Sequence, residues 1–170
     1  MYDGIPLSAN RASARDKHGN DLTVEYSLDK KTWMSDPAAI TATNVGDSAT
    51  VYLRATGSNY AEGQYATSSE KVGVTVRFVT LTSKGANKKY DGTPLTRNAQ
   101  SDVTVGGAGF VDGEGATYNI TGSQTLAGES FNEFTYTLNK GTLDENYFIT
   151  RSFSKLIVTA NDSEVVVTIT

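Results

Sequence analysis

The chain has 170 residues, of which 38% are hydrophobic and 20% charged, and its formal net charge is −4 at pH 7. This composition is typical of folded soluble proteins, and the acidic balance argues against nucleic-acid binding, which calls for a basic stripe. The sequence contains no cysteine, no apolar run long enough to cross a membrane as a helix, and no basic amphipathic segment for a membrane surface. We therefore expect neither a nucleic-acid partner nor membrane contact.

Alternation of apolar and polar residues predicts the strands of the first half. Leu22–Leu28 and Val51–Thr56 alternate in this way, and so does Lys71–Phe78. Asp29–Thr32 is a plausible turn, with Trp33 starting a return strand. No window keeps the helical spacing of apolar residues over three turns, and Ala9–Arg15, which comes nearest, is too short and polar for a helix.

The second half follows the same style. Alternation predicts strands at Val103–Val105, which stops at Gly106-Gly107, and at Thr117–Thr121, Phe134–Asn139 and Lys155–Thr159. Short strands separated by clusters of Gly, Asn, Asp and Ser favour a β-sandwich with one face of each sheet inward. The predicted fold class is all-β.

A six-residue motif occurs twice and indicates two domains. Tyr2-Asp3-Gly4-Ile5-Pro6-Leu7 returns as Tyr90-Asp91-Gly92-Thr93-Pro94-Leu95, at an offset of 88 residues. Asn59-Tyr60 matches Asn146-Tyr147, and Lys71–Val76 matches Lys155–Ala160, in the same order. A period of this size marks tandem domains. We predict domains over residues 1–80 and 81–162, joined near Thr82–Lys88, with 163–170 as the first strand of a following repeat.

The ends of the chain fall out of register with this repeat. If Val79–Ser83 is the first strand of the second domain, then Val165–Thr170 occupies the equivalent place in a third. The first domain would then lack its own first strand and expose a sheet edge, a template for strand addition. We expect Val165–Thr170 to pair with an edge, within the chain or in a neighbour. The alternative is that it extends the last sheet of the second domain.

The repeated motif is predicted to be structural. Asp-Gly before x-Pro is above all a turn, in which Gly takes positive φ, Asp bonds the backbone beyond it and Pro directs the exit. The Tyr ring would cover the end of the core or the seam between domains, and a binding edge is the alternative. The structural turn residues are Tyr2, Asp3, Gly4, Pro6, Tyr90, Asp91, Gly92 and Pro94.

Other candidate sites have simpler structural readings. His18 is the only histidine, and with no cysteine and no second histidine it cannot complete a zinc set. A catalytic triad also fails, because no nucleophile elbow or oriented acid supports it. Calcium at Asp112-Gly113-Glu114 or Asp144-Glu145 lacks the EF-hand spacing. One further alternative is a sugar-stacking face made by Trp33, Tyr52, Tyr65 and Tyr118. Another is an intramolecular isopeptide bond that joins Lys88, Lys89 or Lys155 to Asn161. We expect no catalytic, cofactor or metal residues, and hence no enzyme.

Both halves resemble the bacterial Ig-like repeats of cell-surface adhesins, of the MBG type. The residues that carry the resemblance are Tyr90–Leu95, the two Asn-Tyr steps, and the hairpin Val24–Asp29 leading to Trp33, where Lys30 replaces the usual Gly. The resemblance implies two tandem Ig-like β-sandwich domains and an extracellular, cell-wall-attached protein. Its expected role is a stalk that presents a distal binding region, with neighbouring repeats as partners. The alternative is a module that itself recognises a host glycoprotein or polysaccharide.

Overall fold

The computed structural model describes residues 1–163 and divides the chain into two compact units. Unit 1 is Met1–Arg77 and unit 2 begins at Phe78. The division falls close to the boundary of 80/81 expected from the repeat. The expected junction at Thr82–Lys88 instead lies inside unit 2, in strands β7 (Arg77–Ser83) and β8 (Ala86–Lys89).

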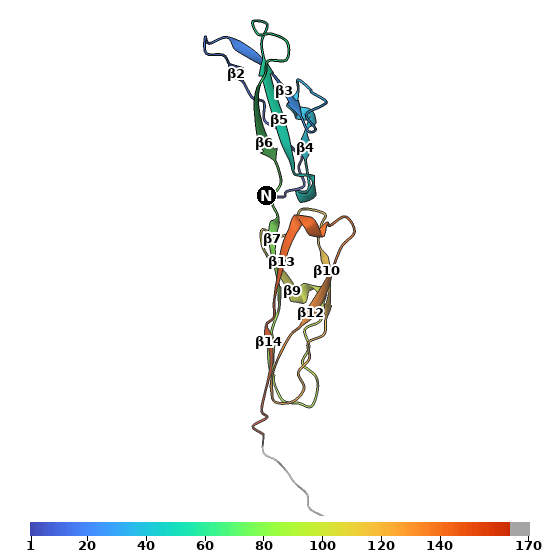
Figure 1. The fold of residues 1–170 in the computed structure, drawn as a ribbon. Helices are drawn as coiled ribbons and strands as arrows, with labels where there is room; N and C mark the ends of the chain where they lie inside the picture. The colour runs from blue at the N-terminus through green and yellow to red at the C-terminus, as the bar shows by residue number, and fades with distance from the viewer. Residues whose placement is uncertain (164–170) are drawn as a thin grey trace, which may run out of the picture. The chain divides into compact units, whose positions relative to one another are not determined.

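Unit 1 is built on a four-stranded antiparallel sheet in the order β2-β3-β5-β6 (Figure 1). Its strands are β2 (Ala14–Arg15), β3 (Asp21–Ser27), β5 (Ala49–Thr56) and β6 (Ala66–Val72). A second, two-stranded sheet pairs β1 (Leu7–Ser8) with β4 (Thr41–Ala42). The 3-10 helices η1 (Pro37–Ala39) and η2 (Val45–Asp47) flank β4 along the chain.

The core of unit 1 lies against one face of this sheet. Alternation along β5 turns Val51, Leu53 and Ala55 to that face, and Tyr52 and Arg54 to the other. The buried core cluster lies at one end of the inner face and comprises Ala9, Tyr26, Ile40, Ala42, Val51 and Val72. Val24 and Leu53 pack against this cluster but are only partly buried. The inner face is therefore less completely covered around these two residues.

Two predicted strands of unit 1 are wrong. Trp33 does not begin a return strand, since only a single bridge joins Tyr26 to Met34. The carboxylate of Asp29 instead accepts hydrogen bonds from the backbone of Lys31 and Thr32, which prolongs the turn. The predicted strand Lys71–Phe78 is split, because β6 ends at Val72 and β7 begins at Arg77. Between them the Val74 amide donates to the Ser48 hydroxyl, 3.1 Å away, and makes no strand pairing.

Unit 2 contains three sheets. In the first, β7 lies between β13 (Tyr147–Ser152) and β9 (Val103–Gly107), and in the second β14 (Lys155–Thr159) lies between β11 (Gly128–Phe131) and β8. The third pairs β10 (Ala116–Ile120) with β12 (Phe134–Leu138). The 3-10 helices η3 (Gln100–Asp102) and η4 (Asp144–Asn146) precede β9 and β13.

The buried residues of unit 2 come from all three sheets. Val79 and Leu81 of β7, Phe134 of β12 and Leu156 and Val158 of β14 are almost fully buried. Phe134 makes edge contacts with the rings of Tyr118 and Phe153. The predicted strands β9, β10, β12 and β14 are confirmed, although burial does not alternate along β9, where Val105 is exposed. The described chain is all-β, consistent with a β-sandwich. The predicted strand Val165–Thr170 lies outside the described residues.

Candidate functional site

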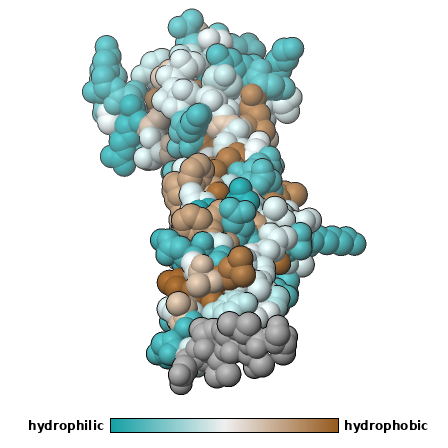
Figure 2. Space-filling model, turned by 90° about the horizontal axis from the view of Figure 1, so that it is seen from below, coloured by the Kyte–Doolittle hydropathy of each residue, from teal (hydrophilic) through white to brown (hydrophobic). Residues whose placement is uncertain are grey.

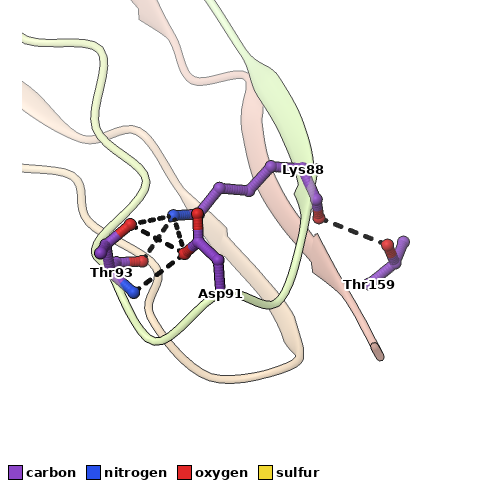
Figure 3. A network of polar contacts seen from close by, with 4 residues as sticks. All are labelled: Lys88, Asp91, Thr93 and Thr159. Carbon is purple, nitrogen blue, oxygen red and sulfur yellow. Dashed lines mark hydrogen bonds and ion pairs between the residues drawn. The ribbon is translucent and has the colours of Figure 1, made fainter. Parts of the chain in front are cut away.

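In unit 2 the repeated motif forms a tightly bonded turn around one lysine (Figure 3). The ammonium group of Lys88 donates to Asp91 Oδ1 at 2.7 Å and to the carbonyl and hydroxyl oxygens of Thr93 at 2.6 and 2.7 Å. The same Asp91 oxygen accepts from the Thr93 amide at 2.9 Å. The hydrogen bond from Lys88, followed by those from the Thr93 amide and hydroxyl, holds the pKa of Asp91 well below its usual range. The turn is thereby tied to β8.

The motif in unit 1 makes the corresponding turn. Asp3 Oδ1 accepts from the amide of Ile5 at 2.9 Å, and Gly4 has a φ of 77°, against 80° for Gly92. In both units the tyrosine amide of the motif donates to a threonine carbonyl at 2.8 Å, Tyr2 to Thr75 and Tyr90 to Thr159. Tyr2 is buried whereas Tyr90 is 38% exposed. Both prolines, Pro6 and Pro94, lie at exposed turn positions.

The Asn-Tyr steps also make matching contacts in the two units. The hydroxyl of Tyr60 donates to Asp16 Oδ2 at 3.0 Å, and that of Tyr147 to Glu114 Oε2 at 2.7 Å. Asp16 lies on the loop that follows β2, and Glu114 lies on the loop that follows β9. Hydrogen bonds from Asn20, Tyr60 and the His18 amide lower the pKa of Asp16 to about 2. The same loop is thus tied to the same tyrosine in both copies.

The outer face of the unit 1 sheet gathers aromatic rings around Arg54. Its guanidinium carbon lies 4.2 Å from the ring centroid of Trp33 and 4.4 Å from that of Tyr65. Its Nε donates to Glu25 Oε2 at 2.7 Å, across the β3–β5 pair. Such stacking fixes the guanidinium plane and both rings. We call Glu25, Trp33, Arg54 and Tyr65 the arginine–aromatic cluster.

A shallow hollow of about 570 Å³ adjoins this cluster. The hollow is lined by Trp33, by Tyr52 with the Lys30 ammonium 4.2 Å from its ring centroid, and by Thr67 and Ser69 of β6. Aromatic faces beside hydroxyl groups and a cation are the chemistry that binds sugars or acidic groups. Of the four aromatic residues predicted from the sequence, Trp33, Tyr52 and Tyr65 share this face, whereas Tyr118 belongs to unit 2 and packs on Phe134.

The remaining sequence candidates are dispersed. His18 is exposed on the Asp16–Asn20 loop, and within residues 1–163 no three His, Asp or Glu side chains gather as a group able to hold a metal ion. Glu114 accepts from Tyr147, and Asp144 and Glu145 lie in the first turn of η4. The candidate isopeptide lysines contact other groups: Lys88 contacts Asp91, Lys89 contacts Asp162 and Lys155 contacts Glu129.

Sequence reasoning missed Arg54, Glu25 and Lys88. Arg54 and Glu25 occupy outward positions of alternating strands, where charged residues ordinarily only meet solvent. A signal for the pair did exist, because opposite charges on two neighbouring strands suit a cross-strand pair. Its recognition required the register that places Glu25 opposite Arg54. Lys88 was considered only for a covalent cross-link, and its contact with the turn depends on the course of β8.

Comparison with known proteins assigns no family to the chain. No family model, no curated protein and no solved structure matches the chain. No helix among the described residues is both long and apolar enough to cross a membrane. On the face shown in Figure 2, hydrophobic patches alternate with hydrophilic ones. Over residues 1–163 the structure defines an all-β fold of two compact units, and the aspartate and tyrosine-amide contacts of the motif occur in both.

Proposed function

We propose that the chain consists of two tandem Ig-like β-sandwich repeats from the stalk of a bacterial cell-surface adhesin. In this proposal the repeats are non-catalytic, extracellular and attached to the cell wall, and their partners are neighbouring repeats of the same polypeptide. They hold a distal binding region away from the cell. The observation that carries the proposal is the contact repeated in each unit, from the motif tyrosine amide to a threonine carbonyl.

Further contacts support a repeat with a structural role. Turn hydrogen bonds to Asp3 and Asp91, and carboxylate contacts of Tyr60 and Tyr147, occur at matching places in the two units. These polar groups bond to the backbone or to each other across loops. Repeating such contacts while most surface residues differ is what a spacer requires, since each copy needs the same fold and no particular surface.

The test is a spacer exchange in the complete surface protein. Both units are replaced by two unrelated β-sandwich domains, and adhesion of the cells to their target is measured beside a variant in which both units are deleted. We expect the exchange to preserve adhesion, because the distance between the cell and the binding region is kept. The deletion should reduce adhesion, because that distance becomes shorter. Loss of adhesion in the exchange variant, with normal surface display, would contradict the stalk and point to binding by these units.

A second candidate function rests on the arginine–aromatic cluster and its hollow. Trp33, Tyr52 and the hydroxyls of β6 offer a surface on which a host glycan or glycoprotein could stack. A glycan array with the intact chain tests this, with Tyr52→Ala as the variant and Tyr136→Ala, in unit 2, as the control. Saturable binding that falls with Tyr52→Ala alone would support a binding module, and no binding to any glycan would speak against it.

A further inference from the structure

The turn that follows β3 holds a lysine in a backbone conformation that favours glycine. Lys30 has a φ of 61°, and among residues 1–163 it is the one residue other than glycine with a positive φ. In this region the Cβ of an ordinary residue crowds a neighbouring carbonyl oxygen, a strain that glycine avoids. Strain of this kind gathers at ligand sites, where the side chain has a task of its own. The side chain of Lys30, rather than its backbone, therefore accounts for a lysine at this position.

That side chain reaches the hollow beside the arginine–aromatic cluster. The Lys30 ammonium nitrogen lies 4.2 Å from the ring centroid of Tyr52, and both residues line the hollow. No carboxylate in the described part of the chain forms an ion pair with this ammonium group. The neighbouring Asp29 is engaged in the turn, where it accepts from the amides of Lys31 and Thr32. The ammonium group thus remains available to an anion from outside.

The hollow is cationic although the chain as a whole is acidic. Lys30 is the only charged residue among the described residues that line it, whereas the net charge of the chain is −4. An ammonium group and an anion form a charge-assisted hydrogen bond, which is stronger than the bond that the same group makes to a neutral hydroxyl. The charge of the lining therefore favours an acidic ligand over a neutral one.

The remaining side chains of the hollow suit a sugar ring. Thr67 and Ser69 lie opposite Arg54 and Tyr52 in the β5–β6 pair and share their outer face. Both residues are exposed, so their hydroxyl groups can bond a ligand. Trp33 adds an aromatic wall. Hydroxyl groups together with an aromatic surface match the polar edge and the apolar face of a sugar.

The aromatic wall is held in place before a ligand arrives. Trp33 is stacked on the guanidinium of Arg54 at 4.2 Å, and Arg54 is in turn bonded to Glu25 at 2.7 Å. A side chain fixed in this way loses little conformational entropy on binding. The volume of the hollow, about 570 Å³, also falls within the range of small-ligand sites, about 300–1,000 Å³.

We propose that this hollow binds an acidic saccharide. A carboxylate of the sugar accepts from the Lys30 ammonium group, sugar hydroxyls bond Thr67 and Ser69, and a ring face packs on Trp33. The strained turn is what brings the ammonium group to the hollow. This inference rests on the second candidate function, binding by unit 1, and specifies the class of ligand; it does not depend on the stalk.

The test titrates the full chain with sugars that differ only in charge. The probes are sialyllactose and tri-galacturonic acid, each beside its own methyl ester. Trp33 is the single tryptophan and lines the hollow, so its fluorescence follows binding directly. We expect an acidic sugar to bind about tenfold more tightly than its ester, with an affinity that falls as salt is added. The pair that shows this preference distinguishes a sialic acid from a uronic acid.

Lys30→Gly separates a ligand contact from a contribution to the fold. Glycine adopts a φ of 61° without strain, so the urea midpoint of unit 1 should not fall, whereas the preference for the acidic sugar should be lost. Lys31→Ala is the matched control. It removes the same charge from the next residue, which is exposed and does not line the hollow, and it should keep the preference.

The outcomes separate this inference from the function on which it rests. Equal binding of acid and ester, or a preference that survives in Lys30→Gly, would overturn the acidic ligand and leave a binding module for neutral sugars. No binding of any of the four probes would overturn both. A lower urea midpoint for Lys30→Gly would also overturn the inference, because the lysine would then serve the turn itself.

Discussion

Replacing Leu81 by alanine tests whether the two units unfold independently. Leu81 lies at the centre of β7 with 0% exposure, between β9 and β13. Truncation of a fully buried leucine removes its burial and leaves a cavity, which together cost about 2–5 kcal/mol. We take about 3 kcal/mol for unit 2. With a urea dependence of about 2 kcal/mol per M for a domain of this size, the midpoint of unfolding of unit 2 should fall by about 1.5 M.

The chain supplies its own reporter for this experiment. Its single tryptophan, Trp33, lies in unit 1, so its fluorescence follows unit 1 while far-UV circular dichroism follows both. Leu81→Ala should lower the urea midpoint of the dichroism transition that belongs to unit 2, whichever of the two transitions that is. The midpoint of the Trp33 fluorescence transition should stay in place. Leu126→Ala, at a leucine that is 68% exposed, is the matched control and should change neither. Equal shifts of both signals would refute the reasoning, because the units would then unfold together.

Three further predictions concern individual contacts. Tyr147→Phe removes the hydroxyl that donates to Glu114 and accepts from the Val111 amide, and it should lower the free energy of unfolding of unit 2 by about 1–3 kcal/mol in urea. Tyr60→Phe should lower that of unit 1 by less, because Tyr60 is exposed. Asp16 has a folded pKa of about 2 against 3.8 ordinarily, so its contribution to the stability of unit 1 is present above pH 3.8 and lost as pH falls to about 2. Trp33 fluorescence in urea should show this loss, and Asp16→Asn should make it smaller, the remainder coming from Asp29 and Asp47, whose pKa values are also lowered. Gly107→Ala places a Cβ 2.7 Å from the Phe78 carbonyl oxygen and should destabilise unit 2 by about 1–3 kcal/mol more than Gly109→Ala, which has a similar φ and open space; equal midpoints for the two variants would contradict this.

Strands with one buried face could be predicted from the sequence. β3, β5, β12 and β14 all alternate because a single sheet face meets the core. The same rule failed at Lys71–Phe78, where alternate apolar residues continue through Val74 and Val76 although the chain leaves one sheet and enters another. Periodicity reports which residues are buried, but it carries no information about which strand is the neighbour. That information lies in tertiary pairing.

The candidate site shows the same limit. Trp33, Tyr52 and Tyr65 could be recognised as aromatic candidates, and a turn at the motif follows from Asp-Gly chemistry. The arginine–aromatic cluster depends on the register that sets Glu25 opposite Arg54, and the Lys88 network depends on β8 running beside the motif. The Arg54–Glu25 pair joins residues 29 positions apart, whereas Lys88 lies only three to five positions before the residues that it binds. Tyr118 failed for the complementary reason, since a residue type alone does not fix the unit to which a side chain contributes.

The contacts of the repeated motif differ in how far they depend on the rest of each unit. The turn contacts of Asp3 and Asp91 need only neighbouring residues, so they form equally in both units. In unit 2, Lys88 and β7 both precede the motif along the chain. Lys88 donates to Asp91 of the turn, and β7 lies between β9 and β13. A contact made within the motif therefore recurs with the motif, whereas a contact made by a residue outside it depends on the strands that surround the turn.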